Sequence, residues 1–200
     1  MSSATALSNY AATFPISLLI SLYLQEVKGL DAQSAGLILI VQPVVQSAFS
    51  PVAGKLSDKI QPRYIASSGM AMITIVLLII PLLITPESSL IVLMILLGLL
   101  GLGFAAFSSP NTNAIMGSVD KKNYSMASAT TGTVRLVGQA FSMGITTMII
   151  SIIIGNRAIT PEVSDGLMKV IHITFIIFAV ICAVGVYASM ARGSGKEPAD

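Results

Sequence analysis

Residues 50–63 read SPVAGKLSDKIQPR and place four charged side chains within nine positions. The four are Lys55, Asp58, Lys59 and Arg63. Long apolar stretches flank this cluster on both sides, and a glycine, Gly54, comes just before its first lysine. The pattern indicates a short charged loop between two apolar segments that each cross a hydrophobic layer.

The remainder of the chain supports that interpretation through its composition. Hydrophobic residues make up 54% of the sequence, charged residues only 10%, and the mean hydropathy is +0.86. Soluble domains carry about 25% charged residues, whereas apolar stretches of about 18 residues or more are typical of membrane spans. Backbone polar groups in lipid must be satisfied within their own segment, which favours helices. We therefore predict an all-α integral membrane protein.

Six membrane-spanning helices are expected, separated by joints rich in charge, proline and glycine. The predicted spans are Ala4–Leu24, Ala35–Ala53, Tyr64–Ile84, Leu90–Ser108, Ser125–Ile154 and Val170–Met190. Together they form one transmembrane domain over residues 1–191, followed by a polar tail at 192–200. The fifth span is longer than a bilayer requires, and its Ser- and Thr-rich start is expected in water or in a polar cavity.

The distribution of basic residues predicts the orientation, because cytoplasmic loops carry an excess of Lys and Arg. With both termini inside, the inner loops and the tail hold seven basic residues and the outer loops hold three. We therefore expect a multi-pass protein of the cell membrane with both termini in the cytoplasm. The amino terminus lacks a basic region, so a cleaved signal peptide is not expected.

Polarity differs from span to span. The third and sixth spans are almost entirely apolar and are expected to face lipid over most of their circumference. The second span carries Gln42 and Gln46 one turn apart on one face. Such amides fit a hydrogen bond between helices and a cavity wall equally well. Arg135, the charge within the fifth span, fits either a structural side chain that extends to the interface or a gating or binding group.

The sequence argues against catalysis. It contains one histidine, His172, and one cysteine, Cys182, and we find no catalytic set, no metal-ligand spacing and no cofactor motif. A net charge of +2 gives no reason to expect a nucleic-acid partner. No Asp or Glu lies within a predicted span, so this chain offers no carboxylate for coupling transport to protons.

Three stretches carry a resemblance to a known family. They are residues 23–36 (YLQEVKGLDAQSAG), residues 50–63 with Gly69 behind them, and residues 101–110 with 127–138. Their order resembles the major facilitator superfamily, and within it the carboxy-terminal six-helix half of a 14-spanning drug:proton antiporter. The second stretch resembles the glycine–x–x–x–aspartate–basic motif of that family's loop between helices 2 and 3. Gln61 departs from the motif, which often has glycine there.

The resemblance implies that the chain is one half of a major facilitator fold, because that fold has two halves related by an axis along the membrane normal. The missing side would be a second six- or eight-helix half or a second copy of this chain. A truncated product, a split-gene product and a homodimer all remain open. The resemblance implies that the first and fourth helices of a half line the cavity and that the second and fifth flank it. The candidate substrate residues are then Asn9, Phe14, Ser17, Gln42, Gln46, Phe104, Phe107 and Asn111.

The function implied is half of a proton-coupled multidrug efflux antiporter, which confers antibiotic resistance by exporting small amphipathic or cationic compounds. The coupling carboxylates would belong to the other half. Gly54, Lys55, Asp58, Lys59 and Arg63 would form the loop that latches the halves in the outward-facing state. A loop that only sets the topology is the simpler alternative. A non-transporting remnant or assembly partner, or a half that carries another small solute, is the alternative function.

Overall fold

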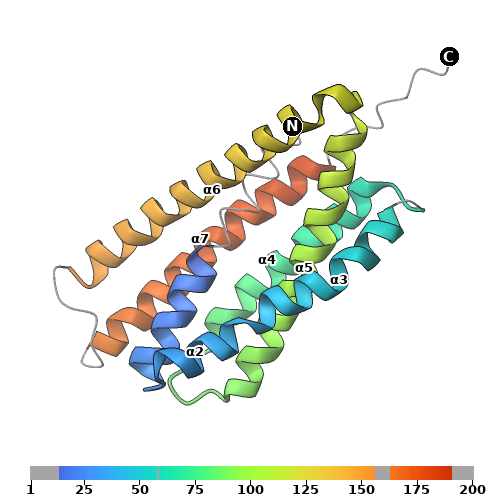
Figure 1. The fold of residues 1–200 in the computed structure, drawn as a ribbon. Helices are drawn as coiled ribbons and strands as arrows, with labels where there is room; N and C mark the ends of the chain where they lie inside the picture. The colour runs from blue at the N-terminus through green and yellow to red at the C-terminus, as the bar shows by residue number, and fades with distance from the viewer. Residues whose placement is uncertain (1–13, 58, 156–162, 191–200) are drawn as a thin grey trace.

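The computed structural model describes residues 14–57, 59–155 and 163–190, and every regular element in these ranges is a helix (Figure 1). The first helix is described over Phe14–Val27, and its last residues, Tyr23–Val27, form the π-helix η1. The others are α2 (Ala32–Leu39), α3 (Val41–Ser57), α4 (Pro62–Leu83), α5 (Leu90–Gly117), the 3₁₀-helix η2 (Lys121–Asn123), α6 (Tyr124–Ile153) and α7 (Ser164–Met190).

Five helical stretches are long and apolar enough to cross a membrane. They are Ala32–Ser57, Pro62–Leu83, Leu90–Gly117, Lys121–Ile153 and Ser164–Tyr187. The protein is therefore a multi-pass membrane protein, as predicted. The first predicted span, Ala4–Leu24, lies only in part within the described residues, so the count of six crossings stays a prediction.

Two helix boundaries differ most from the predicted spans. α5 continues to Gly117 and does not end at Ser108, and α7 begins at Ser164 and not at Val170. Pro110 lies inside α5, where its ring removes one backbone hydrogen bond; membrane helices tolerate this because their surroundings satisfy the freed carbonyl. At about 1.5 Å per residue α5 is roughly 42 Å long, so it extends beyond a hydrocarbon core of about 30 Å.

The second predicted span is divided into α2 and α3 at Ile40. Backbone bonds from Ile40 to Gly36 and from Val44 to Ile40 carry the helical path across the break. The cause is Pro43, which has no N–H to donate and whose ring crowds the carbonyl four residues earlier, at Leu39. The span is thus one crossing with a local distortion.

α4 lies at the centre of the described bundle, between α5 and α7 (Figure 1). Of the residues in the most apolar 18-residue stretch of α4, 50% are buried. The same fraction is 44% for α7, 17% for α6 and 6% for α2–α3. The expectation that the third and sixth spans face lipid over most of their circumference is therefore wrong. Their uniformly apolar side chains form the core with α5, and Ile73, Leu77 and Phe175 are fully buried there.

Glycines allow α5 to cross both neighbouring helices at close range. A Cβ on Gly69 of α4 would lie 2.7 Å from the carbonyl oxygen of Gly103 and 2.7 Å from the backbone nitrogen of Phe107. A Cβ on Gly101 would lie 2.6 Å from the carbonyl oxygen of Gln42 on α3. Small residues at such crossings let backbones approach in membrane bundles, so α3, α4 and α5 form one tightly packed unit.

Side chains fasten the end of the first helix to the turn between α4 and α5. The buried Tyr23 hydroxyl donates to the carbonyl of Thr85 at 2.7 Å and lies 2.9 Å from the Ser88 hydroxyl. The Lys28 ammonium donates to the carbonyls of Pro86 and Ser88 at 2.7 and 2.6 Å. These bonds hold the π-helical segment in place, so we call residues 23, 28, 85, 86 and 88 the end clasp.

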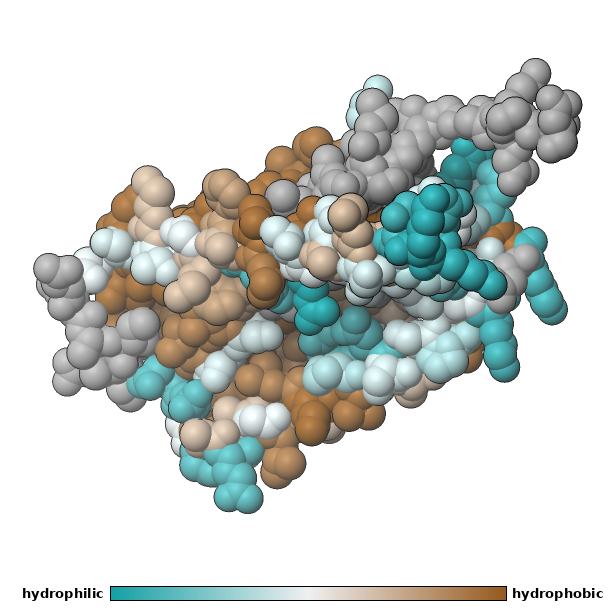
Figure 2. Space-filling model, turned by 45° about the horizontal axis from the view of Figure 1, so that its top comes forward, coloured by the Kyte–Doolittle hydropathy of each residue, from teal (hydrophilic) through white to brown (hydrophobic). Residues whose placement is uncertain are grey.

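The distribution of hydrophobic and hydrophilic residues on the surface is that of a membrane protein whose two ends face water. Figure 2 shows hydrophobic residues over much of the flank and hydrophilic residues gathered toward the two ends. α6 lies along one side of the bundle, packs mainly on α7, and exposes Leu136, Phe141 and Met148 (Figure 1). Its outer face is therefore available to lipid or to another helical unit.

Candidate functional site

The two glutamines of the predicted cavity lie together on α3. The Gln42 side-chain amide donates to the Gln46 side-chain oxygen at 2.9 Å, and both side chains are half-buried. Their turn of α3 packs directly against Gly101 of α5. The pair is therefore held beside the α3–α5 crossing, with part of each amide still accessible.

Three predicted cavity residues of α5 are buried within this chain. Phe104 is 3% exposed and packs in the large core, and Phe107 is fully buried against Ala66 and Met70 of α4. Asn111 is 5% exposed, and its side-chain nitrogen makes no hydrogen bond. In this arrangement the two phenylalanines stabilise the bundle, whereas Asn111 retains an unused donor. Their contact with a substrate stays a prediction.

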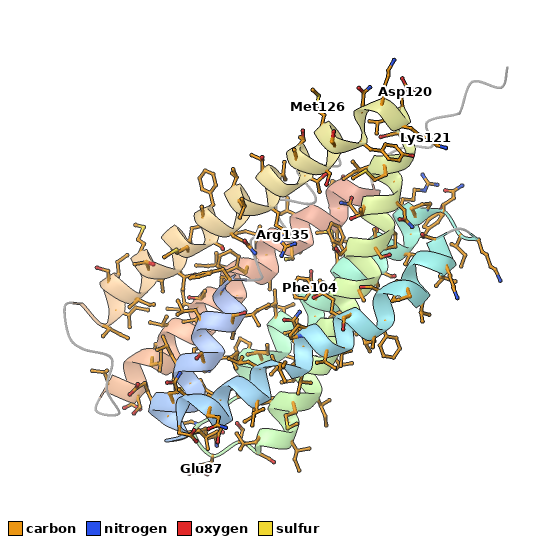
Figure 3. The ribbon with its side chains drawn as sticks, in the orientation of Figure 1. Glu87, Phe104, Asp120, Lys121, Met126 and Arg135 are labelled. Carbon is orange, nitrogen blue, oxygen red and sulfur yellow. The ribbon has the colours of Figure 1, made fainter. Side chains whose placement is uncertain are left out.

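The first helix supplies the remaining cavity candidates. Phe14 is half-buried and Ser17 is exposed, whereas Asn9 lies outside the described residues. Arg135 is exposed on α6, and Figure 3 shows its side chain pointing from α6 toward the body of the bundle. An arginine that points toward the protein suits a cavity or interface role better than a lipid-facing one.

The charged loop begins at a tight contact between α3 and α5. A Cβ on Gly54 would lie 3.0 Å from the Ser109 hydroxyl, and the Asn113 amide donates to the Ser57 hydroxyl at 3.2 Å. Gly54 was predicted to be functional from the sequence, whereas Ser57 and Asn113 were not. The spacing could have indicated the contact, because Gly54 and Ser57 lie on one face of their helix, and Ser109 and Asn113 lie on one face of theirs.

The basic residues of the loop point outward. Lys55 and Lys59 are exposed, and Arg63 is half-buried with its guanidinium 4.7 Å from the Tyr64 ring centroid and a hydrogen bond of 2.9 Å to the Tyr64 hydroxyl. Asp58 lies outside the described residues. The latch that these residues were predicted to form is therefore not tested by the structure, and among the described residues no cluster of metal ligands occurs.

Comparison with known proteins agrees with this architecture. The model of the family described as Major Facilitator Superfamily matches residues 2–198. The riboflavin transporter RibZ of Clostridioides difficile is 32% identical over 68% of this chain and 29% of its own length. The uncharacterized MFS-type transporter YcnB of Bacillus subtilis is 27% identical over 91% of this chain and 38% of its own.

A third relative carries a drug-resistance name. The multidrug resistance protein Stp of Mycobacterium tuberculosis is 27% identical over 71% of this chain and 26% of its own length. The chain thus matches about a quarter to two fifths of the curated relatives' length. Because the family model covers nearly all 200 residues, this chain belongs to the Major Facilitator Superfamily, a family of membrane transporters.

Proposed function

We propose that this chain forms one half of a transporter that exports small amphipathic or cationic compounds across the cell membrane in exchange for protons. The observation that carries the proposal is the uneven burial of the helices. α4 and α7 are packed inside the unit, whereas α2–α3 and α6 expose large apolar side chains along their length. Two open flanks fit a unit that pairs with a second one.

The second unit is either a six- or eight-helix half or another copy of this chain. The first support is length, because the relatives are roughly three times as long as the matched segment. The second is charge, because the predicted spans contain no carboxylate to carry a proton. On this proposal the coupling carboxylates come from the partner, while Gln42 and Gln46 of this chain contact the solute.

The proposal is tested by reconstituting the chain in vesicles, alone and with a candidate amino-terminal half, and following efflux of a fluorescent cation driven by a pH gradient. We expect transport only with the partner or from a dimer. Replacing both Gln42 and Gln46 by leucine should reduce it at least tenfold, whereas the exposed Gln33→Leu should not. Transport by a strict monomer would contradict the two-unit account.

A second candidate solute is a flavin-like compound, because a relative named as a riboflavin transporter shares 32% identity with this chain. Inhibition of the cation efflux by riboflavin, but not by a sugar of similar size, would favour it. A non-transporting assembly role would be favoured instead if neither the chain alone nor any paired half moved a solute while a stable complex still formed.

A further inference from the structure

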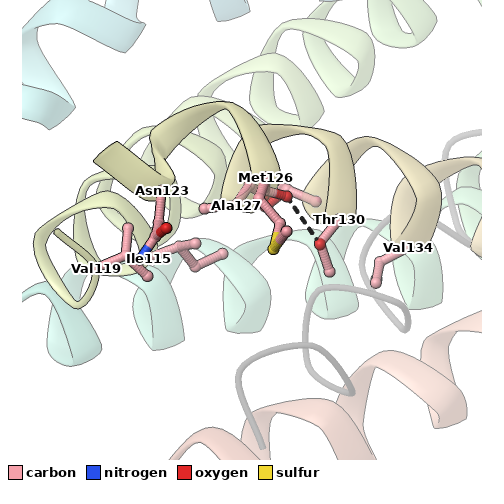
Figure 4. A pocket seen from close by; sticks show the side chains of 8 residues that line it. Ile115, Val119, Asn123, Met126, Ala127, Thr130 and Val134 are labelled. Carbon is pink, nitrogen blue, oxygen red and sulfur yellow. Dashed lines mark hydrogen bonds between the residues drawn. The ribbon is translucent and has the colours of Figure 1, made fainter. Parts of the chain in front are cut away.

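The two longest helices diverge from a short linker and leave a cavity in the angle between them. α5 ends at Gly117, η2 spans Lys121–Asn123, and α6 runs back along the bundle (Figure 1). The cavity has a volume of about 410 Å³. Ile115 of α5 and Val119, just beyond the end of α5, form one wall, and Met126, Ala127 and Val134 of α6 form the other (Figure 4). Most of its surface is therefore apolar.

Polar groups occur at specific points of this cavity. Thr130 and Thr131 line it, but their hydroxyls already donate to the carbonyls of Met126 and Ala127. They are left with the capacity to accept hydrogen bonds. The Asn123 amide also lines the cavity and makes no capping bond to α6. The walls thus offer contacts to the polar portion of an otherwise apolar ligand.

The cavity continues from the core of the bundle. Phe107 of α5 belongs to a buried cluster that packs against Val134, which also lines the cavity. Ile115, two turns after Phe107, lies on the same face of α5. The apolar wall of the cavity therefore joins the apolar core.

The linker beside the cavity is basic. Lys121 and Lys122 lie in η2, directly before Asn123. Lys122 pairs with Asp120 at 3.5 Å in the open, with both side chains more than 70% exposed, and Lys121 makes no such pair in the described part of the chain. No acidic residue occupies the first turn of α6. A free lysine beside a helix amino terminus attracts an anion.

We propose that this cavity binds an anionic phospholipid from the leaflet that surrounds the α5–α6 linker. One acyl chain fills the apolar space, an ester carbonyl accepts from the Asn123 amide, and the phosphate meets Lys121 and Lys122. A lipid fits better than a cationic solute because the linker beside the cavity carries two lysines against one carboxylate. The site is distinct from the proposed transport function and does not depend on it.

The test uses the absence of tryptophan from the sequence. A Tyr124→Trp reporter at the start of α6 is placed in phosphatidylcholine vesicles that contain brominated phosphatidylglycerol or brominated phosphatidylcholine with the same acyl chains. We expect the anionic lipid to associate on the order of fivefold more strongly, which is the attraction typical of one lysine near a membrane surface. Equal quenching by the two lipids, or stronger quenching by a brominated cationic amphiphile, would overturn the proposal.

Variants separate the headgroup contact from the cavity. The double change Lys121→Gln and Lys122→Gln should abolish the preference, whereas arginine at both positions, or Lys59→Gln in the other loop, should preserve it. Ala127→Leu fills the cavity and should lower the phosphatidylglycerol retained after purification, as measured by native mass spectrometry. Ala129→Leu, on an exposed face of the same helix, is the matched control. Unchanged retention in Ala127→Leu would also refute the site.

Discussion

At the scale of single residues, glycines determine how closely the helices pack. Gly69, Gly101 and Gly103 occupy positions where a methyl group would meet backbone atoms or a branched side chain at 2.6 to 2.7 Å. Gly98, on the same helix as two of them, faces open space. A glycine is therefore required where its helix face contacts a neighbouring helix, and it is not required on an open face.

Gly69→Ala should lower the free energy of unfolding by about 1–3 kcal/mol, as overpacking does in well-packed interiors. Its new methyl group would press on the backbone of α5, which cannot rotate away as a flexible side chain would. Gly98→Ala should be neutral or slightly stabilising, because alanine has the higher helix propensity. Unfolding by denaturant in detergent measures both, and equal stabilities would show that α4 and α5 separate easily.

At the scale of helices, hydropathy and length predicted most of the element boundaries. α4 at Pro62–Leu83 and α6 at Tyr124–Ile153 agree closely with the predicted Tyr64–Ile84 and Ser125–Ile154. The end of α5 was missed because Ser108–Asn113 contains proline and several polar residues, which resemble a loop. The helix persists there because Asn113 and Phe107 contact α3 and α4.

The start of α2 depends on a carboxylate cap. Asp31 accepts from the backbone N–H groups of Gln33 and Ser34 at 3.1 and 3.3 Å, and the hydrogen bond to the Ser34 side chain, with these backbone bonds, lowers the pKa of Asp31 below its usual 3.8. A lowered pKa means that the charged form stabilises the helix start above that ordinary value. The stabilisation is lost as pH falls through the folded-state pKa.

We therefore expect the Gln33 and Ser34 amides to be protected from hydrogen exchange near neutral pH, in excess of the intrinsic rate change. They should lose that excess only as the pH falls below 3.8, the usual pKa of an aspartate. Asp31→Ala should lack the protection at every pH. Asp31→Asn, which still caps but does not titrate in this range, should keep it throughout. If the protection in Asp31→Asn still depended on pH, the titrating group would be one other than Asp31.

At the scale of the whole molecule, the structure corrected which helices face outward. The sequence distinguished polar from apolar spans, and the Gln42–Gln46 face was predicted from their spacing. It could not show that α4 and α7 pack on each other, because a helix that is apolar all round carries no directional signal. The end clasp could not be predicted from the sequence either. Tyr23 bonds a backbone carbonyl 62 residues away, and no local sequence pattern marks such a contact.

The two ends of the bundle should lie on opposite sides of the membrane. Glu87 lies at one end, and Asp120 and Lys121 at the other (Figure 3). In a Cys182→Ala background, we expect Lys59→Cys to react with a membrane-impermeant maleimide only after the cells are opened, and Glu87→Cys to react in intact cells. Cys182 is the one cysteine of the sequence, so its removal leaves the introduced cysteine as the one thiol that can react. The reverse labelling pattern would invert the proposed topology.

The end clasp also orders events during synthesis. The partners of Tyr23 are Thr85 and Ser88, and those of Lys28 are Pro86 and Ser88, all about 60 residues later in the chain. The first helix therefore leaves the ribosome and enters the membrane long before its anchor exists. It can be secured only after α4 has crossed and the turn beyond it has emerged. Translation that stops before residue 88 leaves the inserted helix without the Ser88 partner of Tyr23 and Lys28.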